Sequence, residues 1–411
     1  MMEEWKEYRL IDVLDALIDY RGKTPKKTAF GVPLITAKII KNGRIETPSE
    51  FISLNDYDSW MVRGFPKVGD VVLTTEAPLG EVAQLDDANI ALAQRVVTLR
   101  GKSGVLDNTY LKYYFLSNVG HQRLKARETG TTVTGIKQSE LREVIVDVPP
   151  YEIQVRISNI LKSLDDKIEV NRKINENLEQ QAQAVFKSWF VDFEPFKNGE
   201  FVESELGMIP KGWRVERIED LSQKMASGGT PKSLNKDYYL GNIKWYSTKE
   251  LKDCFLFDSE KHISEDALKN SSAKMFPEGT VLMAIYASPT VGRLGILTNP
   301  ATFNQAAVGI VPKENVGSEF IYLSLLSERT NLNNLASGAA QQNLNVGIVK
   351  NYNILVPEQK ALDRFNRLAR SYFLLLKKNT EESRRLAELR DTLLPKLMSG
   401  ELKVNEIEDI L

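Results

Sequence analysis

Two long stretches of the chain place apolar residues at alternating spacings of four and three positions. Each stretch begins next to proline, at Pro149-Pro150 in one case and at Pro357 in the other. Proline near the first turn is typical of a helix start, and the 4,3 spacing is that of a coiled coil. The pattern therefore predicts two long helices, over residues 151–190 and 358–400. The positions of the two stripes, in order, are Ile157, Leu161, Leu164, Ile168, Asn171, Asn175, Leu178, Ala182, Val185 and Trp189, and Phe365, Ala369, Tyr372, Leu376, Asn379, Ser383, Leu386, Arg390, Leu393 and Leu397.

Polar residues interrupt both stripes near the middle, at Asn171 and Asn175 in the first and at Asn379 and Ser383 in the second. If the helices pack antiparallel with facing residue numbers adding up to 554, Asn171 faces Ser383 and Asn175 faces Asn379. Such a polar layer fixes the register of a helix pair at some cost in stability. A parallel pairing would also bring polar residues together. Antiparallel packing is favoured because residues 191–212, with a turn-rich Phe-Glu-Pro-Phe-Lys-Asn-Gly segment, fit a short connection better than a return along a helix.

The two stripes belong to a repeat of the whole chain, in which corresponding residues lie close to 208 positions apart. Loops shift this offset locally, and each copy begins with a tryptophan shortly before an apolar stretch. The matching pairs are Trp5 with Trp213, Thr24 with Thr230, Gly80 with Gly292, Gln94 with Gln305, Gly130 with Gly338, Ile136 with Leu344, and Pro149 with Pro357. The chain is therefore a diverged tandem duplication, and we expect the same fold to occur twice in it.

Before each long helix, short β-branched runs alternate with glycine and proline, as at Val71-Val72-Leu73-Thr74-Thr75. This pattern predicts a mixed α/β domain in each copy, and an α+β fold for the chain. We expect globular domains at 1–150 and 213–357, helices at 151–190 and 358–400, a linker at 191–212 and a tail at 401–411.

Composition places the chain among ordinary globular proteins. Its 411 residues are 42% hydrophobic and 27% charged, and no apolar run is long enough to cross a membrane. The charged start, Glu3-Glu4-Trp5-Lys6-Glu7, does not resemble a signal peptide, so we expect a cytoplasmic protein without membrane attachment. One cysteine and two histidines make a metal site improbable on count alone.

Catalytic motifs are absent from the sequence. Gly101-Lys102-Ser103 lacks the earlier glycine of a phosphate-binding loop, and no GxGxxG occurs. Asp147-Val148-Pro149-Pro150-Tyr151 resembles the Asp-Pro-Pro-Tyr motif of amino-methyltransferases, but Val148 interrupts it and a helix start explains it better. We therefore expect no catalytic residues and no cofactor bound by this chain.

Positive charge is concentrated locally, although the net charge is only -1. Residues 21–44 contain seven basic and no acidic residues, and residues 223–249 contain Lys224, Lys232, Lys236, Lys244 and Lys249 against Asp237. A solvated basic face is one explanation, and contact with nucleic acid is the other.

The arrangement resembles the specificity subunit of type I restriction-modification systems. The resemblance covers the whole chain and rests on Ser188-Trp189-Phe190-Val191-Asp192-Phe193-Glu194-Pro195-Phe196 after the first helix, on Glu205-Leu206-Gly207-Met208-Ile209-Pro210-Lys211-Gly212-Trp213, and on the closing segment from Leu393 to Leu402. It implies a non-catalytic reader of double-stranded DNA, in which each domain binds one half of an asymmetric bipartite site and the coiled coil sets the gap.

The resemblance also implies partners. Two methyltransferase subunits would carry S-adenosylmethionine for adenine N6 methylation, and restriction subunits would use ATP and Mg²⁺ for translocation and cleavage. The recognition domains of such proteins diverge, so no base-reading residue is transferred from the family.

We assign candidate DNA contacts from residue chemistry and from the duplication. Thr-Pro-Lys turns recur in the basic segments, and the glycine before each, Gly22 and Gly229, would let the backbone approach phosphate. Candidate backbone contacts are Arg21, Lys23, Thr24, Lys26, Lys27, Lys38, Thr230, Lys232 and Lys236. Base reading requires paired donors and acceptors, and Gln94 and Arg95 have Gln305 and Asn304 as expected counterparts. Candidate base contacts are Gln94, Arg95, Thr131, Thr132, Thr134, Lys137, Asn304, Gln305, Gln341, Gln342 and Asn343.

A coiled-coil adaptor that uses the same two domains to hold other proteins is the alternative. The near-neutral net charge suits it, but the acid-free basic segment is not needed by an adaptor.

Overall fold

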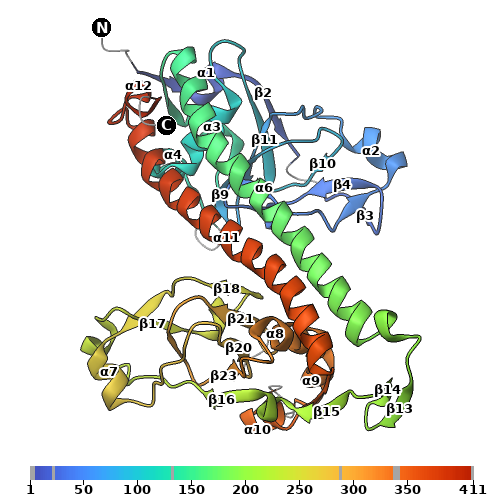
Figure 1. Cartoon of the computed structure of the whole chain (residues 1–411). Helices are drawn as coiled ribbons and strands as arrows, with labels where there is room; N and C mark the ends of the chain where they lie inside the picture. The colour runs from blue at the N-terminus through green and yellow to red at the C-terminus, as the bar shows by residue number, and fades with distance from the viewer. Residues whose placement is uncertain (1–4, 21–23, 131–133, 287–288, 337–342, 409–411) are drawn as a thin grey trace. The chain divides into compact units, whose positions relative to one another are not determined.

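The computed structural model describes residues 5–20, 24–130, 134–286, 289–336 and 343–408 (Figure 1). It divides into unit 1, residues 1–169 with 384–411, and unit 2, residues 170–383. Both divisions fall inside the long helices, α6 (Tyr151–Phe190) and α11 (Gln359–Met398). Each 40-residue helix is about 60 Å long at about 1.5 Å per residue. Each unit therefore contains one globular domain and parts of both helices.

The globular part of unit 1 is built on two four-stranded sheets, ordered β2-β11-β8-β9 and β10-β4-β7-β3, with the small pairs β1-β12 and β5-β6. Its strands are β1 (Lys6–Arg9), β2 (Leu14–Asp19), β3 (Lys27–Thr28), β4 (Val32–Ile35), β5 (Ile40–Lys41), β6 (Arg44–Ile45), β7 (Phe51–Ile52), β8 (Val71–Thr75), β9 (Leu79–Gln84), β10 (Ala91–Leu92), β11 (Val96–Gly101) and β12 (Ile145–Val148). Its short helices are α1 (Leu10–Val13), α2 (Leu54–Trp60), α3 (Asn108–Leu116), α4 (Asn118–Lys125) and α5 (Gln138–Arg142), and α12 (Val404–Glu408) follows α11.

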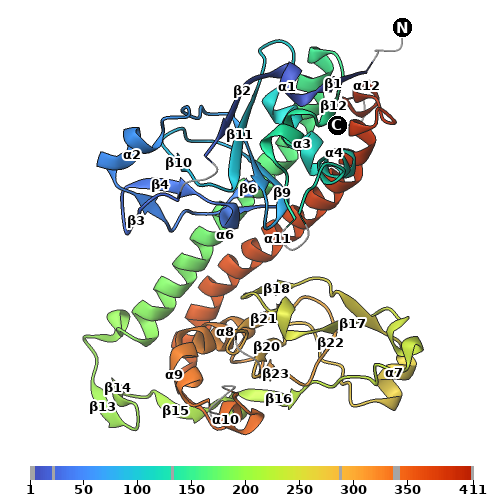
Figure 2. The ribbon, with the colours of Figure 1, turned by 180° about the vertical axis from the view of Figure 1, so that it is seen from behind.

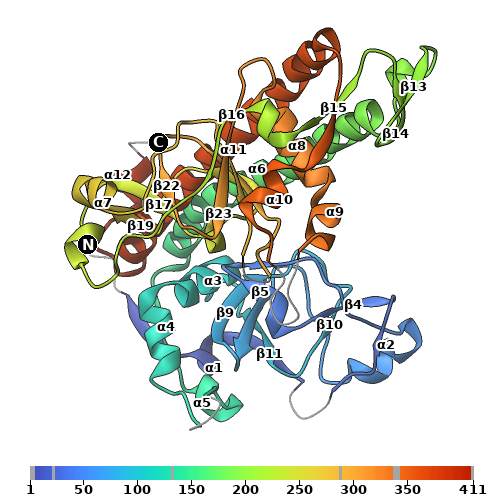
Figure 3. The same cartoon turned by 90° about the horizontal axis from the view of Figure 1, so that it is seen from below.

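The layers of unit 1 explain its continuous apolar strands. Helices α3 and α4 lie on one side of β9 and β11, and β4, β10 and α2 lie on the other (Figure 3). Val71 and Leu73 of β8 join the core beneath α3, whereas Val72 joins the core of the second sheet. A strand buried on both faces reads as a continuous apolar run.

Unit 2 repeats this plan with sheets ordered β16-β23-β20-β21-β18 and β19-β17-β22 and the pairs β13-β14 and β15-β24. Its strands are β13 (Phe201–Ser204), β14 (Gly207–Pro210), β15 (Arg214–Arg217), β16 (Ser222–Ser227), β17 (Ile243–Tyr246), β18 (Cys254–Leu256), β19 (Lys261–Ile263), β20 (Val281–Ala284), β21 (Leu294–Leu297), β22 (Thr302–Phe303), β23 (Ala307–Pro312) and β24 (Asn353–Val356). Its short helices are α7 (Glu265–Asn270), α8 (Ser318–Ser327), α9 (Arg329–Asn334) and α10 (Val346–Lys350). The order α8 and α9, β20 and β21, β17 and β22, then α7 is visible in Figure 2.

Strand register confirms the duplication. Lys6 pairs with Val148 in β1-β12, and Arg214 pairs with Val356 in β15-β24, so both partners are shifted by 208 positions. The main sheets differ at one edge. In unit 2, β18 runs parallel to β21, whereas in unit 1 the β5-β6 hairpin lies beside β9.

In unit 2, the two long helices meet in the expected polar layer. Asn171 is 1% exposed, and its Nδ2 donates to Ser383 Oγ (3.3 Å) and to Glu382 Oε2 (2.7 Å). Asn379 Nδ2 donates to Asn175 Oδ1 (3.0 Å). These pairs are those of the antiparallel alignment, so the parallel alternative is wrong. Asn171 Oδ1 is buried and has no hydrogen-bond partner in the part of the chain that the structure describes, which costs stability while the layer fixes register.

Apolar contacts extend the antiparallel pairing away from this layer. In unit 1, Ile157 and Leu161 of α6 share a core with Leu394 and Leu397 of α11. In unit 2, Phe186 of α6 packs near Phe365 of α11, with ring centroids 5.9 Å apart. The core of unit 1 therefore includes side chains from the C-terminal end of the second repeat.

Aromatic residues fix the chain where it leaves α6. The Phe190 ring lies 4.7 Å from Phe365 and 5.7 Å from Trp213, and the Phe196 ring lies 4.9 Å from Trp213. This cluster explains the aromatic Ser188–Phe196 segment, because its rings hold the linker and the start of the second domain against α11.

A partly buried ion cluster joins both long helices to α3 in unit 1. Asp165 Oδ1 accepts from Arg390 Nη1 (2.7 Å), and Asp165 Oδ2 accepts from Tyr113 OH (2.7 Å) and from Lys112 Nζ (3.3 Å). Burial opposes ionisation of Asp165, but the favourable effects of Lys112, Tyr113 and Arg390 outweigh it, and the pKa of Asp165 lies below its ordinary value.

We expect Asp165→Asn to lower the free energy of unfolding of the full chain by about 3 kcal/mol at pH 7, because it leaves the buried Lys112 without its carboxylate and Arg390 with the exposed Asp391 alone. The lowered pKa means that this contribution is complete at neutral pH and is lost only as the pH falls through the folded-state pKa. Urea unfolding followed by circular dichroism measures it. Asp166→Asn is the control, since Asp166 forms an exposed ion pair with Lys162 (2.6 Å) and its loss should cost less than about 1 kcal/mol. Equal effects of the two variants would contradict the role of the cluster.

Candidate nucleic-acid interface

Three segments of unit 1 meet at what we call reading edge 1: the turn Ala93–Arg95 before β11, the end of β8 at Thr75, and the segment Gly135-Ile136. Thr75 N donates to Arg95 O (3.0 Å), and Ile136 N donates to Thr75 O (2.9 Å). Gly135 also bridges Glu76, and an added Cβ there would lie 2.7 Å from Thr75 O, so only glycine permits this approach.

The same backbone pattern forms reading edge 2 in unit 2, from the turn Asn304–Ala306, Ile285 and Leu344. Ile285 N donates to Ala306 O (2.8 Å), and Leu344 N donates to Ile285 O (2.9 Å). Matching bonds make Arg95 equivalent to Ala306 and Gln94 equivalent to Gln305. The expected pairing of Arg95 with Asn304 is therefore wrong, because loops have increased the local offset by three residues beyond 208.

The side chains at the two edges are held differently. Arg95 Nε forms an ion pair with Glu76 Oε1 (2.6 Å), which orients the guanidinium and offsets part of its charge. At reading edge 2, the Thr230 hydroxyl donates to Gln305 Oε1, so a candidate backbone contact and a candidate base contact lie together. Asn304 Oδ1 accepts from Ala306 N (3.2 Å), which commits that oxygen to the turn.

The other candidate base contacts are partly described. Thr134 and Lys137 are exposed beside reading edge 1, and Asn343 is half-buried beside Leu344. Thr131, Thr132, Gln341 and Gln342 lie outside the described residues, as do Arg21 and Lys23 among the candidate backbone contacts.

The remaining candidate backbone contacts are exposed, but they are not equivalent. Lys27 forms an ion pair with Glu50 (2.8 Å), so its charge is partly used within the protein. Lys26 and Lys38 in unit 1 have no carboxylate partner among the residues that the structure places, and the same holds for Lys232 and Lys236 in unit 2. Thr24 is exposed and precedes β3.

One basic position was missed by the sequence analysis. Lys38 lies in the 3₁₀ turn Ala37–Ile39 after β4, and Lys249 lies in the 3₁₀ turn Thr248–Glu250 after β17. Ala93 N donates to Ile35 O (3.0 Å), so the end of β4 contacts reading edge 1, and Asn304 N donates to Tyr246 O (2.9 Å), so the end of β17 contacts reading edge 2. Each 3₁₀ turn directly follows that strand end. The offset of 211 that relates Gln94 to Gln305 also relates Lys38 to Lys249, and it would have identified Lys249 as a candidate backbone contact.

Gly229 does not serve the expected approach to phosphate. It is buried, and an added Cβ would lie 2.1 Å from Ser272 O. Trp245 Nε1 also donates to Gly229 O (2.9 Å). Glycine is therefore required at this position for packing inside unit 2, while Gly22 lies outside the described residues.

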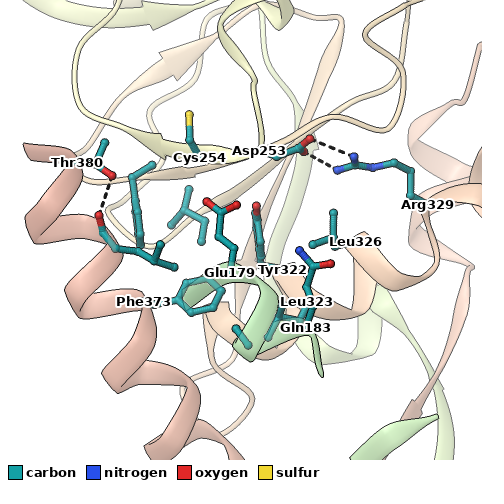
Figure 4. A pocket seen from close by; sticks show the side chains of 14 residues that line it. Glu179, Gln183, Asp253, Cys254, Tyr322, Leu323, Leu326, Arg329, Phe373 and Thr380 are labelled. Carbon is teal, nitrogen blue, oxygen red and sulfur yellow. Dashed lines mark hydrogen bonds and ion pairs between the residues drawn. The ribbon is translucent and has the colours of Figure 1, made fainter. Parts of the chain in front are cut away.

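A separate pocket of about 290 Å³ in unit 2 lies between α6, α8, α11 and β18 (Figure 4). Glu179 and Tyr322 point into it, and Cys254, which is half-buried, lies in its wall. Asp253 beside it is engaged by Arg329 in a two-point ion pair (3.0 and 2.5 Å).

The pocket offers little reactive chemistry. Burial, together with the nearby Asp253 charge, raises the pKa of the Cys254 thiol, and burial raises that of Tyr322, so both groups stay protonated and are poor nucleophiles. Among the described residues, no group of three or more His, Cys, Asp or Glu side chains is arranged to hold a metal ion.

Comparison with known proteins identifies the family. The model of the type I restriction modification DNA specificity domain matches residues 2–180 and 210–382. The chain belongs to this family. It is 31% identical to the type I restriction enzyme MjaIX specificity subunit of Methanocaldococcus jannaschii, over 98% of this chain and 95% of that protein. It is 25% identical to the HindI specificity subunit of Haemophilus influenzae, over 98% of this chain and 100% of that protein.

A solved structure shares the fold of this family member. The crystal structure of the type I restriction-modification system S subunit from M. genitalium matches with a TM-score of 0.57 and 17% identity, over 96% of each chain. The matched family model describes DNA specificity domains and not a catalytic domain, in agreement with the absence of catalytic motifs. None of the helices that the structure describes has both the length and the hydropathy needed to span a bilayer.

We expect Lys232→Ala to weaken DNA binding to a similar extent on all sequences and to reduce the slope of log K against log salt concentration by about 1, as the loss of one phosphate contact should. Titration of labelled duplexes at several salt concentrations measures both quantities. Lys211→Ala is the control, because Lys211 is exposed but paired with Glu200 (2.6 Å). A changed recognition sequence in Lys232→Ala would instead assign this residue to base reading.

Proposed function

We propose that this chain is the DNA specificity subunit of a type I restriction-modification complex and that it recognises an asymmetric bipartite site. Each unit reads one half-site with its reading edge, and α6 with α11 sets the separation. The chain itself contributes sequence recognition, while methylation and cleavage belong to other subunits.

The duplicated reading edge carries this proposal. The same two backbone hydrogen bonds recur at Thr75 and at Ile285, so one scaffold is present twice. The side chains on the scaffold differ: Gln94 is followed by Arg95, whereas Gln305 is followed by Ala306. A shared scaffold with different hydrogen-bonding groups favours two half-sites of different sequence.

The partners and cofactors follow from this proposal. Two methyltransferase subunits would bring S-adenosylmethionine and methylate adenine N6, and restriction subunits would bring ATP and Mg²⁺. The chain would act in the cytoplasm, where it meets double-stranded DNA. Family membership favours this function over the protein-binding adaptor.

Co-expression of the chain with the methyltransferase subunit of its own host should produce N6-methyladenine at a two-part motif with an unspecified spacer. Genome-wide mapping of the modified base measures this. The Gln94→Ala and Gln305→Ala variants should each relax a different half of the motif. A continuous motif in the wild type, or no motif, would contradict the bipartite model.

Insertion of one heptad into both long helices should lengthen the spacer and leave the half-sites unchanged. Suitable sites are between Glu169 and Val170 and between Ser383 and Arg384, which lie at the same level of the antiparallel pair next to the polar layer. Seven residues add about 10 Å of helix, or about three base pairs.

The same methylation map reads out the spacer. Insertion into α6 alone is the control, because it shifts the helix pair out of register and should abolish specific methylation. An unchanged spacer in the double insertion would show that the helices do not set the gap.

A further inference from the structure

The two units expose an apolar side chain at the same structural position. Phe30 is 82% exposed and Leu240 is 78% exposed, although such side chains usually gain about 2 kcal/mol from burial. A single exposed apolar residue needs no explanation, but two at equivalent positions of diverged domains do.

The equivalence rests on the glycine that follows each side chain. An added Cβ at Gly31 would lie 2.1 Å from Ile52 O, and one at Gly241 would lie 2.1 Å from Ile263 O. Ile52 and Ile263 end β7 and β19, the strands that pair with β4 and β17. Both glycines therefore hold the backbone against the same neighbouring strand.

Local hydrogen bonds hold both side chains on ordered turns. In unit 1, Thr28 Oγ1 donates to Phe30 O (2.8 Å). In unit 2, Leu240 N donates to Asp237 O (3.3 Å), and Tyr239 OH donates to Pro231 O (2.8 Å). An exposed apolar residue on such a turn loses little conformational entropy when it binds.

The surroundings of both side chains favour nucleic acid. Residues 24–45 contain no Asp or Glu, and Lys26 is unpaired among the described side chains four positions before Phe30. Lys232 and Lys236 precede Leu240 on one loop, which also contains Thr230 bonded to Gln305. In unit 2, Asp237 also lies on this loop, so two lysines stand against one acidic residue between Thr230 and Leu240. In unit 1, the first acidic residue after the basic segment is Glu46.

Each side chain lies at the opposite end of a strand from its reading edge. In unit 1, β4 leads from Phe30 to Ile35, whose carbonyl accepts a hydrogen bond from Ala93 N in the reading-edge turn. In unit 2, β17 leads from Leu240 to Tyr246, whose carbonyl accepts a hydrogen bond from Asn304 N. At about 3.3 Å per residue, the separation is about 17–20 Å, or five to six base-pair steps.

We propose that Phe30 and Leu240 each insert between base pairs a few steps from the half-site that their unit reads, and so unstack the duplex there. This inference rests on the proposed function. Proteins that use such apolar side chains unstack a step in order to bend DNA and extend their contact with it.

The test uses the full chain in complex with its methyltransferase and duplexes containing its motif, with 2-aminopurine placed at successive steps around each half-site. We expect Phe30→Ala and Leu240→Ala each to weaken binding about tenfold and to abolish the fluorescence increase beside a different half-site. Phe30→Leu should retain both properties, because it stays apolar. Val68→Ala is the control, since Val68 is 65% exposed but lies outside the basic segment 24–45.

The outcomes separate the two proposals. Wild-type affinity in both alanine variants, or a loss of affinity while the fluorescence increase remains, would overturn the insertion and leave the bipartite reader intact. Failure of the wild-type complex to select any bipartite motif would overturn both. Unchanged thermal unfolding of the alanine variants excludes misfolding as the cause of a loss.

Discussion

The antiparallel pairing of α6 with α11 is the contact on which the rest of the structure depends. Each long helix has an apolar stripe that its own globular domain covers only in part, and the other helix completes the cover. Leu394 and Leu397, encoded at the end of the second repeat, complete the core that Ile157 and Leu161 begin. The repeats of the sequence and the compact units of the structure are therefore different divisions of the chain. The Asn171–Ser383 and Asn175–Asn379 layer makes only one alignment favourable, because a shift would place amide groups against apolar side chains.

Duplication preserved the packing scheme and changed its chemistry. In unit 1, Lys112, Asp165 and Arg390 form an ion cluster between α3 and the helix pair. The equivalent residues of unit 2 are Tyr322, Phe373 and Ala182, which line a pocket of about 290 Å³ instead. The same geometry can thus be filled by charge pairs or left partly open. The reading edges are held by backbone hydrogen bonds, so their side chains can also differ between the copies. The two domains can therefore present different hydrogen-bonding groups on the same backbone.

Much of the architecture was predictable, and the reasons are local. The 4,3 spacing from Ile157 to Trp189 and from Phe365 to Leu397 identified both helices. The offset of 208 identified the duplication, and it also relates the observed pairs Lys6–Val148 and Arg214–Val356. Prediction failed where loops altered the offset. Asn304 was paired with Arg95, although the backbone bonds place Ala306 there, and Lys249 was overlooked as the counterpart of Lys38.

The sequence by itself determined the duplication and the two long helices, because these depend on periodicity, and it favoured the antiparallel register because of the short turn-rich connection. The hydrogen bonds of the polar layer decided that register. Only the tertiary structure decided which side chains share a surface. Thr230 and Gln305 are 75 positions apart and meet because β22 and the turn after it pack against the Gly228-Gly229 backbone. Phe30 and Leu240 also became comparable only in the fold, since strand pairing around Gly31 and Gly241, and not sequence identity, makes their positions equivalent. Long-range contacts of this kind are set by how strands and loops pack together, and no local pattern in the sequence records them.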